Sequence, residues 1–133
     1  MTLRILAIDD SLTIRTLLRQ TVENAGFACA TANDGQDGVD MFTEVDPDVV
    51  ITDINMPRLD GFGVIEAIRT GNHNARVPIL VLSTESSEAL KARARAAGAT
   101  GWLVKPFEDL QLIAILRRVT GYSGPGSALP GKV

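Results

Sequence analysis

Short apolar runs alternate along this chain with longer segments in which apolar residues recur at helical spacing. The runs are four to six residues long and mostly β-branched or otherwise apolar, as is typical of buried parallel strands. They predict strands over residues 3–8, 27–31, 48–52, 77–82 and 101–104. The intervening segments predict helices over residues 12–25, 35–44, 61–70, 86–97 and 108–119.

Local signals support several of the predicted helix ends. Ser11 is a suitable N-cap for the first helix, and Gly26 is a suitable residue to end it. Ser86 or Ser87 caps the fourth helix, which ends at Gly98. The core-facing positions expected on the first helix are Ile14, Leu17, Leu18, Val22 and Ala25.

Strict alternation of strand and helix predicts a parallel sheet with right-handed crossovers. Five such units match an α/β fold of the flavodoxin-like (βα)5 type, a doubly wound five-stranded sheet in the order 2-1-3-4-5. At roughly 150 residues per domain, the 133-residue chain is expected to form one domain over residues 1–120. Glycine and proline are frequent in residues 121–133, which we expect to form a flexible tail.

Three aspartates follow two strands that are neighbours in this order. Asp9 and Asp10 follow the first strand and Asp53 follows the third, at the switch point where doubly wound sheets bind ligands. Single loop aspartates are often solvated or cap helices, but three at one point repel one another unless a cation neutralises them. Mg²⁺ prefers such oxygen ligands and keeps several waters, so the sequence predicts a magnesium site.

Two hydroxyls and a lysine complete this polar edge. Ser83 and Thr84 follow the fourth strand, and Lys105 follows the fifth, where it supplies a positive charge. A carboxylate beside a divalent cation can attack phosphorus and form an aspartyl phosphate. Phosphoryl transfer needs mainly positioning and charge neutralisation, which this cluster offers. A Ser-His-Asp triad is not expected, since His73 precedes the fourth strand at the opposite end of the sheet.

Composition narrows the function classes further. The chain has 13 basic and 16 acidic residues, a net charge of −3 that argues against a nonspecific nucleic-acid binder. The single cysteine excludes an internal disulfide, and the single histidine excludes a multi-histidine metal site. No apolar run approaches the ~20 residues that span a bilayer, and no signal peptide is recognisable. We expect a cytoplasmic protein without membrane insertion.

Charge is unevenly divided along the chain. Residues 1–83 carry six basic and twelve acidic groups, whereas residues 84–133 carry seven basic and four acidic groups. The basic excess falls on the face of the fourth helix, fifth strand and fifth helix, which suits acidic, amphipathic partner segments. Its cations are Lys91, Arg93, Arg95, Arg117 and Arg118.

The fifth predicted helix is apolar on nearly all sides, which indicates that it is buried twice or binds a partner. The stripe expected to face the core contains Leu112, Ile115, Leu116 and Val119. The opposite stripe contains Leu110, Ile113 and Ala114. This second stripe faces a partner or a second copy, unless its members are ordinary scattered apolar residues.

Four sequence runs resemble the receiver domain of two-component response regulators. They read IDDS (8–11), ITDINMPRLDG (51–61), VLSTE (81–85) and GWLVKPF (101–107), and the resemblance extends over residues 3–120. The chain is most similar to the stand-alone chemotaxis CheY type, because it is too short for an output domain. The surface of the domain would then itself be the output.

The resemblance implies a role for each aspartate of the cluster. Asp53 would accept a phosphoryl group from the phosphohistidine of a sensor histidine kinase. Asp10 and Asp53 would hold Mg²⁺, and Asp9 would do so directly or through water. The backbone carbonyl of Asn55 would be a further ligand.

The resemblance also implies roles for the surrounding residues. Ser83 would hydrogen-bond the phosphoryl group, and Lys105, aimed by a cis bond to Pro106, would pair with its oxygens. Asn55 and Glu85 would flank the path of the hydrolytic water and tune the lifetime of the phosphate.

Two positions depart from the family pattern. Trp102 stands where the family usually has tyrosine or phenylalanine, whose ring moves inward on activation; a static, half-exposed indole is the alternative. Ser83 and Thr84 are adjacent hydroxyls, and strand alternation turns only one of them toward the site. The motif register favours Ser83.

These observations predict a phosphorylation-activated signalling switch rather than an enzyme. The face of the fourth helix, fifth strand and fifth helix would control a downstream protein, such as the flagellar motor switch in chemotaxis. Alternatively, the chain is a phosphorelay intermediate or phosphate sink that exchanges phosphate with a histidine phosphotransfer domain. A magnesium-dependent aspartyl phosphatase is disfavoured because Asn55 replaces the second aspartate that such enzymes need. A flavodoxin is disfavoured by the acidic first loop.

Overall fold

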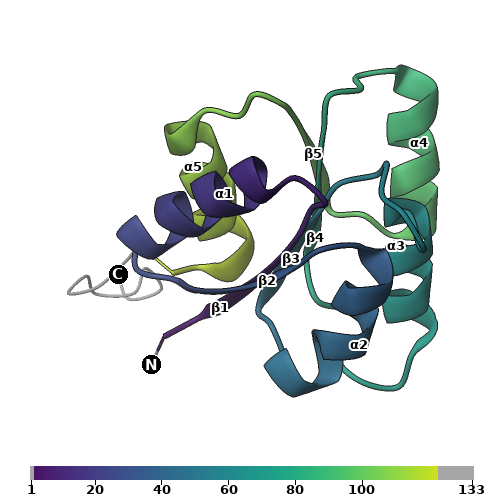
Figure 1. Ribbon diagram of the computed structural model, residues 1–133, viewed down its shortest axis with the longest axis horizontal. Coiled ribbons are helices and arrows are strands. Elements are labelled where there is room, and N and C mark those ends of the chain that lie inside the picture. Colours follow the sequence, from purple (N-terminus) through teal and green to yellow (C-terminus); the bar gives the residue numbers. More distant parts are fainter. Residues whose placement is uncertain (1, 123–133) are drawn as a thin grey trace.

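A five-stranded parallel sheet forms the middle layer of the computed structural model, which describes residues 2–122 (Figure 1). The strands run in the order β2-β1-β3-β4-β5, so the predicted doubly wound α/β fold is confirmed. Strand β4 ends later than predicted, because Ser83 still pairs with Val104 of β5. The strand bounds are Arg4–Ile8 (β1), Ala28–Ala32 (β2), Val49–Thr52 (β3), Ile79–Ser83 (β4) and Gly101–Val104 (β5).

Helices α1 and α5 cover one face of the sheet, and α2, α3 and α4 cover the other (Figure 1). They span Leu12–Asn24 (α1), Gly35–Val45 (α2), Gly61–Thr70 (α3), Glu88–Ala97 (α4) and Asp109–Thr120 (α5). Ser11 caps α1 as predicted, its hydroxyl accepting a hydrogen bond from the Ile14 N–H. Of the two serines before α4, Ser87 is the cap, so this helix begins at Glu88 instead of residue 86.

Two apolar clusters fill the space between the sheet and its two helix layers. Strands β1, β3 and β4 are almost fully buried, which explains why they read as continuous apolar runs. On α1, Leu18 and Val22 are buried as expected, but Leu17 is 45% exposed, and its predicted place in the core is wrong. Leu17 lies about 100° around the helix from Leu18, and Thr21 occupies a buried position instead.

The two apolar stripes of α5 are less separate than predicted. Leu112 and Leu116 are fully buried, as expected for the core stripe. In the second stripe, Leu110 is 83% exposed and Ala114 is exposed, but Ile113 packs partly against the core. The apolar surface that α5 leaves for a partner is therefore narrower than the sequence suggests.

The last described residues pack onto the domain. Gly121 ends α5 with a left-handed backbone, φ 74°, and Tyr122 stacks edge-on against Phe27 with ring centroids 5.1 Å apart. The flexible tail predicted for residues 121–133 lies outside the described residues from residue 123 onward, and its boundary stays a prediction. None of the helices within residues 2–122 is long and apolar enough to cross a membrane.

Helix α3 begins directly against the strand end that carries Asp53. The Asp60 carboxylate caps this helix by accepting a hydrogen bond from the Gly63 N–H at 2.9 Å. A Cβ on Gly61, the first helical residue, would meet the Asp53 carbonyl oxygen and lie 2.8 Å from Ile54 Cα. The missing side chain at Gly61 therefore lets α3 approach the polar edge of the sheet closely.

We expect Gly61→Ala to lower the free energy of unfolding by about 1–3 kcal/mol, the usual effect of overpacking a rigid interior. Gly63→Ala is the matched control, because the nearest atoms to its Cβ would be side-chain atoms of Leu59 and the Asp60 carboxylate instead of backbone. Urea unfolding followed by circular dichroism measures both variants. Parent-like stability of Gly61→Ala would contradict the close approach.

Candidate functional site

The carboxyl ends of β1 and β3 lie side by side, because Ile8 pairs with Thr52 in neighbouring strands. Asp9 and Asp53 follow these paired residues directly, and the Asp53 N–H donates to the Ile8 carbonyl oxygen at 3.0 Å. Together with Asp10, they each place one carboxylate oxygen within 4.8 Å of the others. The structure thus brings together the three aspartates that the sequence analysis singled out.

Asp9 is the most buried of the three, with 1% of its surface exposed. Its Oδ1 accepts a hydrogen bond from the Ser11 N–H at 2.9 Å. Asp9 Oδ2 forms an ion pair with Lys105 Nζ, 2.8 Å away, and within residues 2–122 it has no other polar partner. Burial raises the pKa of the Asp9 carboxyl against the opposing effects of Lys105 and the Ser11 N–H. A buried carboxylate oxygen with a single partner keeps a lone pair that could ligate a metal.

Lys105 reaches from the end of β5 to two aspartates. Its Nζ lies 2.8 Å from Asp9 Oδ2 and 3.0 Å from Asp53 Oδ2. The other oxygen of Asp53, Oδ1, accepts a hydrogen bond from the Ile54 N–H at 2.6 Å. The peptide bond between Lys105 and Pro106 is cis, as the sequence analysis expects. Burial alone would lower the pKa of Lys105, but its contacts with both carboxylates outweigh burial and raise the pKa.

Two hydrogen bonds connect Ser83 to the indole of Trp102. Ser83 is completely buried at the end of β4, whereas Thr84 is exposed, so strand alternation turns only Ser83 inward. The Ser83 hydroxyl accepts a hydrogen bond from the Glu85 N–H at 3.1 Å. The Glu85 carbonyl accepts one from the Trp102 indole N–H at 2.9 Å. The backbone of Glu85 is therefore shared by the site and by strand β5.

The remaining candidate residues lie at the edge of this cluster or away from it. Asn55 and Glu85 are exposed in the loops that follow β3 and β4, and the roles expected for them stay predictions. His73 lies in the segment before β4, where its Nε2 is 2.9 Å from Asp46 Oδ1. It does not approach the aspartate cluster, in agreement with its expected place at the opposite end of the sheet.

Sequence reasoning misses two arginines near the site. Arg15 of α1 donates from Nη1 to the Asp9 carbonyl oxygen at 2.7 Å. Helical side chains point toward the N-terminus, so a long basic residue at the start of a helix can be expected to reach the preceding strand end. Arg58, in the loop after β3, contacts Asp34 at 2.9 Å and Asp37 at 2.6 Å. Its left-handed backbone, φ 67°, has no comparable signal in the sequence.

The donor set of this site fits a hard divalent cation. Three carboxylates face one ammonium, which leaves two negative charges uncompensated. Asp9, Asp10 and Asp53 all offer carboxylate oxygens, the ligand type that Mg²⁺ and Ca²⁺ prefer. Lys105 and Ser83 place an ammonium and a hydroxyl at the same end of the sheet, where they can donate to an anion. Fold and site together are those of a class of domain that could hold a divalent cation with an anion beside it.

Comparison with known families agrees with this class. The model of the response regulator receiver domain matches residues 5–117. The probable chemotaxis protein CheY of Rhizobium etli is 35% identical over 120 residues, which cover 90% of this chain and 93% of that protein. Response regulator MprA of Mycolicibacterium vanbaalenii is 36% identical with 96% of this chain covered, but the match spans only 56% of that relative. The chain therefore belongs to the response regulator receiver domain family.

Solved structures of receiver domains resemble the whole described fold. Chemotaxis protein CheY4 of Vibrio cholerae has a TM-score of 0.85 and 40% identity, with 90% of this chain and 99% of that chain covered. The receiver domain of sensor histidine kinase PA1611 of Pseudomonas aeruginosa has a TM-score of 0.84 and 26% identity, with 92% and 100% covered. That domain holds a magnesium ion in its active site cleft.

We expect Asp10→Asn to raise the melting temperature of the metal-free protein by about 2–4 °C, because it removes one of three mutually repelling carboxylates. MgCl₂ should stabilise the parent and change the variant much less, since only the folded parent offers the full ligand set. Thermal unfolding in EDTA and in MgCl₂ measures both effects.

Asp40→Asn is the matched control for this variant. It makes the same charge change on α2, where Asp40 accepts a hydrogen bond from Gln36 outside the aspartate cluster. Its magnesium response should equal that of the parent. An undiminished response of Asp10→Asn would rule out Asp10 as a ligand.

Proposed function

We propose that this chain is a phosphorylation-driven signalling switch of a two-component system, with Asp53 as the phospho-acceptor. The supporting observation is that Asp53 lies 8% exposed at the end of a central strand, with one oxygen held by a backbone N–H and the other beside Lys105. An oxygen of Asp53 attacks the phosphorus of a phosphohistidine on a sensor kinase, the P–N bond breaks, and the imidazole leaves. The chain acts as a signalling protein rather than as an enzyme.

The proposed cofactor is Mg²⁺, held by Asp9, Asp10 and Asp53 and by the backbone carbonyl of Asn55. The clustering of the three carboxylate oxygens within 4.8 Å supports this assignment, as does the magnesium ion in the receiver domain of PA1611. When bound, the ion offsets the negative charge of the phosphoryl oxygens. Lys105 adds a second positive charge beside the acceptor, because its Nζ already contacts Asp53.

The proposed route from this site to the surface runs through Glu85. A phosphoryl oxygen would take a hydrogen bond from Ser83, whose hydroxyl accepts from the Glu85 N–H. Because the carbonyl of Glu85 anchors Trp102, a shift of this loop changes that anchor. The result is a changed population of conformations on the surface formed by α4, β5 and α5, here named the α4–β5–α5 face.

Asn55 and Glu85 are proposed to set how long the phosphate lasts. Both side chains are exposed in the loops that follow β3 and β4. Their polarity and size would therefore control the access of the hydrolytic water to the aspartyl phosphate.

The proposed partners are a sensor histidine kinase and a downstream protein that binds the α4–β5–α5 face. The likeness to proteins named for chemotaxis, from Rhizobium etli and Vibrio cholerae, supports a role in chemotaxis, with the flagellar motor switch as one candidate target. We propose that the receiver unit spans residues 1–120 and works in the cytoplasm.

A second candidate function remains within the same family. The match to MprA, of which this chain spans 56%, means that receiver domains like this one also occur in longer regulators. A phosphorelay intermediate or phosphate sink would use the same acceptor but return its phosphate to a histidine phosphotransfer domain. Rapid transfer from phosphorylated Asp53 to such a domain would favour this second function.

Beryllofluoride with Mg²⁺ mimics an acyl phosphate, and we expect it to change the fluorescence of Trp102, the only tryptophan of the chain. The reason is that the indole hydrogen-bonds the loop that also carries the Ser83 contact. Asp53→Asn should abolish the change, since it removes the carboxylate to which beryllofluoride binds. Fluorescence titration measures both.

A separate measurement tests the acceptor itself. Acetyl phosphate should add one phosphoryl group to the parent and none to Asp53→Asn, as detected by intact-protein mass spectrometry. Phosphorylation of the variant would disprove the acceptor assignment. Beryllofluoride binding without any fluorescence change would leave the acceptor in place and disprove the switch role of Trp102.

A further inference from the structure

The loop between β3 and α3 turns sharply at Arg58. The Leu59 N–H donates a hydrogen bond to the Pro57 carbonyl at 2.7 Å, and Arg58 between them has a left-handed backbone, φ 67°. A hydrogen bond that spans three residues, with a positive φ at the middle one, marks the rare and strained form of the γ-turn. Within residues 2–122, the other non-glycine residues with positive φ are Asp46 and Asn74, whose types adopt it more readily.

The side chain of Arg58 is bound to the start of α2. Its Nε lies 2.9 Å from Asp34 Oδ2, and its Nη2 lies 2.6 Å from Asp37 Oδ1 and 3.3 Å from Asp34 Oδ1. Asp34 also caps α2, because its Oδ1 accepts a hydrogen bond from the Asp37 N–H at 2.9 Å. A forked guanidinium contact that joins two carboxylates is stronger than a single exposed ion pair. We name Arg58, Asp34 and Asp37 the α2 clamp.

The backbone of the loop also packs against α2. A Cβ on Gly35, the first residue of α2, would meet the Leu59 carbonyl oxygen and lie 2.8 Å from the carbonyl carbon. Helices α2 and α3, which the loop precedes, are neighbours on one face of the sheet (Figure 1). At its other end the loop is tied to β3, since the Gly61 N–H donates to the Ile54 carbonyl at 2.9 Å. Asn55 lies between these two anchors.

We propose that Arg58 is a positioning residue for the cation site, which holds the loop between β3 and α3 against α2 so that the Asn55 carbonyl is presented to the ion. The inference rests on the proposed function, where Asn55 is a ligand. Strained backbone persists only where surrounding contacts determine it, and the α2 clamp supplies those contacts at Arg58. Arg58 acts through the loop backbone, because Asn55 lies only three residues before it.

A purely electrostatic role of Arg58 predicts the opposite effect on the cation. Removing a positive charge from this end of the domain would favour a divalent cation. Removing a positioning residue would disfavour it, because the loop is then free to leave the conformation in which it supplies a ligand. The sign of the change in cation affinity therefore distinguishes the two roles.

The test measures binding of Mn²⁺ to the full chain by the loss of the electron paramagnetic resonance signal of the free ion. Mn²⁺ accepts the same oxygen ligands as Mg²⁺. We expect Arg58→Gln to weaken Mn²⁺ binding about tenfold, as is usual when an outer contact of a metal ligand is lost. Asp37→Asn should weaken it less, since Arg58 keeps its contact with Asp34. The double variant should lose less than the product of the two single losses, because both break one contact.

Two further substitutions at Arg58 separate its side chain from its backbone. Arg58→Gly accepts the positive φ without strain but lacks the clamp and makes the loop more flexible, so its Mn²⁺ affinity should be as low as that of Arg58→Gln. Arg58→Lys should recover part of the affinity, because an ammonium can pair with a carboxylate but cannot form the forked contact.

The chain offers matched controls on α2 itself. Arg4 contacts the opposite end of this helix, where its Nη1 donates to the Val45 carbonyl at 2.7 Å. Arg4→Gln thus makes the same charge change as Arg58→Gln, away from the loop. Asp40→Asn matches Asp37→Asn, since Asp40 contacts Gln36 and not Arg58. Both controls should bind Mn²⁺ as the parent does.

Several results would overturn the inference. They are unchanged or tighter Mn²⁺ binding by Arg58→Gln, parent-like binding by Arg58→Gly, and an equal loss in Arg4→Gln. Circular dichroism establishes that each variant is folded at the temperature of the titration. If Arg58→Gln does not fold, Arg58→Lys and Asp37→Asn decide the question, and parent-like affinity in both would overturn the inference.

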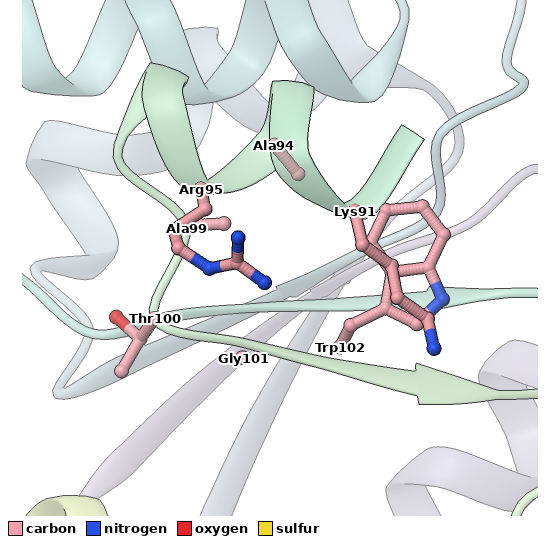
Figure 2. Close-up of a pocket in the computed structure, with 7 residues that line it drawn as sticks. All are labelled: Lys91, Ala94, Arg95, Ala99, Thr100, Gly101 and Trp102. Carbon is pink, nitrogen blue, oxygen red and sulfur yellow. The ribbon is translucent and has the colours of Figure 1, made fainter. Parts of the chain in front are cut away.

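Saturating Mg²⁺ should rescue the later steps in Arg58→Gln. Trp102 lies on β5 beside Lys91 (Figure 2), whereas α2 packs against β1 and β2 on the other side of the sheet. Its fluorescence response to beryllofluoride should therefore be retained, and acetyl phosphate should label Asp53 at the parent rate. At low MgCl₂, labelling of the variant should be slower. A defect that persists at saturating Mg²⁺ would contradict a role in cation binding alone.

Failure of this inference and failure of the proposed function give different results. Labelling of Asp53 in the parent, with parent-like Mn²⁺ affinity in every variant of the α2 clamp, would remove the role of Arg58 and leave the switch function in place. Mn²⁺ affinity that depends on the α2 clamp, without any labelling of Asp53, would do the reverse.

Discussion

Two buried carboxylates held by one lysine are the contact on which the polar edge of the sheet depends. Asp9 and Asp53 are 1% and 8% exposed, and removing such charges from water is costly unless an opposite charge is near. Lys105 Nζ lies within 3.0 Å of both, although it comes from β5, two strands away from β3. One ammonium cannot balance three carboxylates, so the site stays attractive to a further cation. The same imbalance would favour a divalent cation at these carboxylate oxygens.

The loops around this cluster differ in how firmly they are held. The turn after β1 is held by Arg15, whose side chain donates a hydrogen bond to the Asp9 carbonyl. The loop after β3 is held by Gly61, whose N–H donates to the Ile54 carbonyl at 2.9 Å. The loop after β4 is exposed from Thr84 to Ser87. Among the described contacts, its links to the site and to β5 both pass through the backbone of Glu85. Segments with few buried contacts open at the lowest cost. Under the proposed function, this loop is therefore the element best suited to move when Asp53 is phosphorylated.

Both the fold and the acidic cluster could be predicted from the sequence, because both depend on which segments are buried strands. Continuous apolar runs reveal the central strands, and the strand order then places Asp9, Asp10 and Asp53 together without any side-chain detail. The edges of helix faces are less predictable, since periodicity gives the direction of a face but not its width; this is why Leu17 is 45% exposed. The bond between Trp102 and the Glu85 carbonyl depends on the backbone path of a loop, for which the sequence carries no periodic signal.

Glu85 contacts Ser83 and Trp102 through its backbone, so its side chain is left for a separate role. Its N–H and carbonyl connect Ser83 with Trp102, and neither contact involves its side chain. The exposed carboxylate of Glu85 is therefore free to vary in size and charge without breaking the connection. Under the proposed function, the side chain at position 85 would change how fast the phosphate is lost, while the backbone path from Ser83 to Trp102 would stay the same. Lifetime and coupling can then be adjusted independently within one loop.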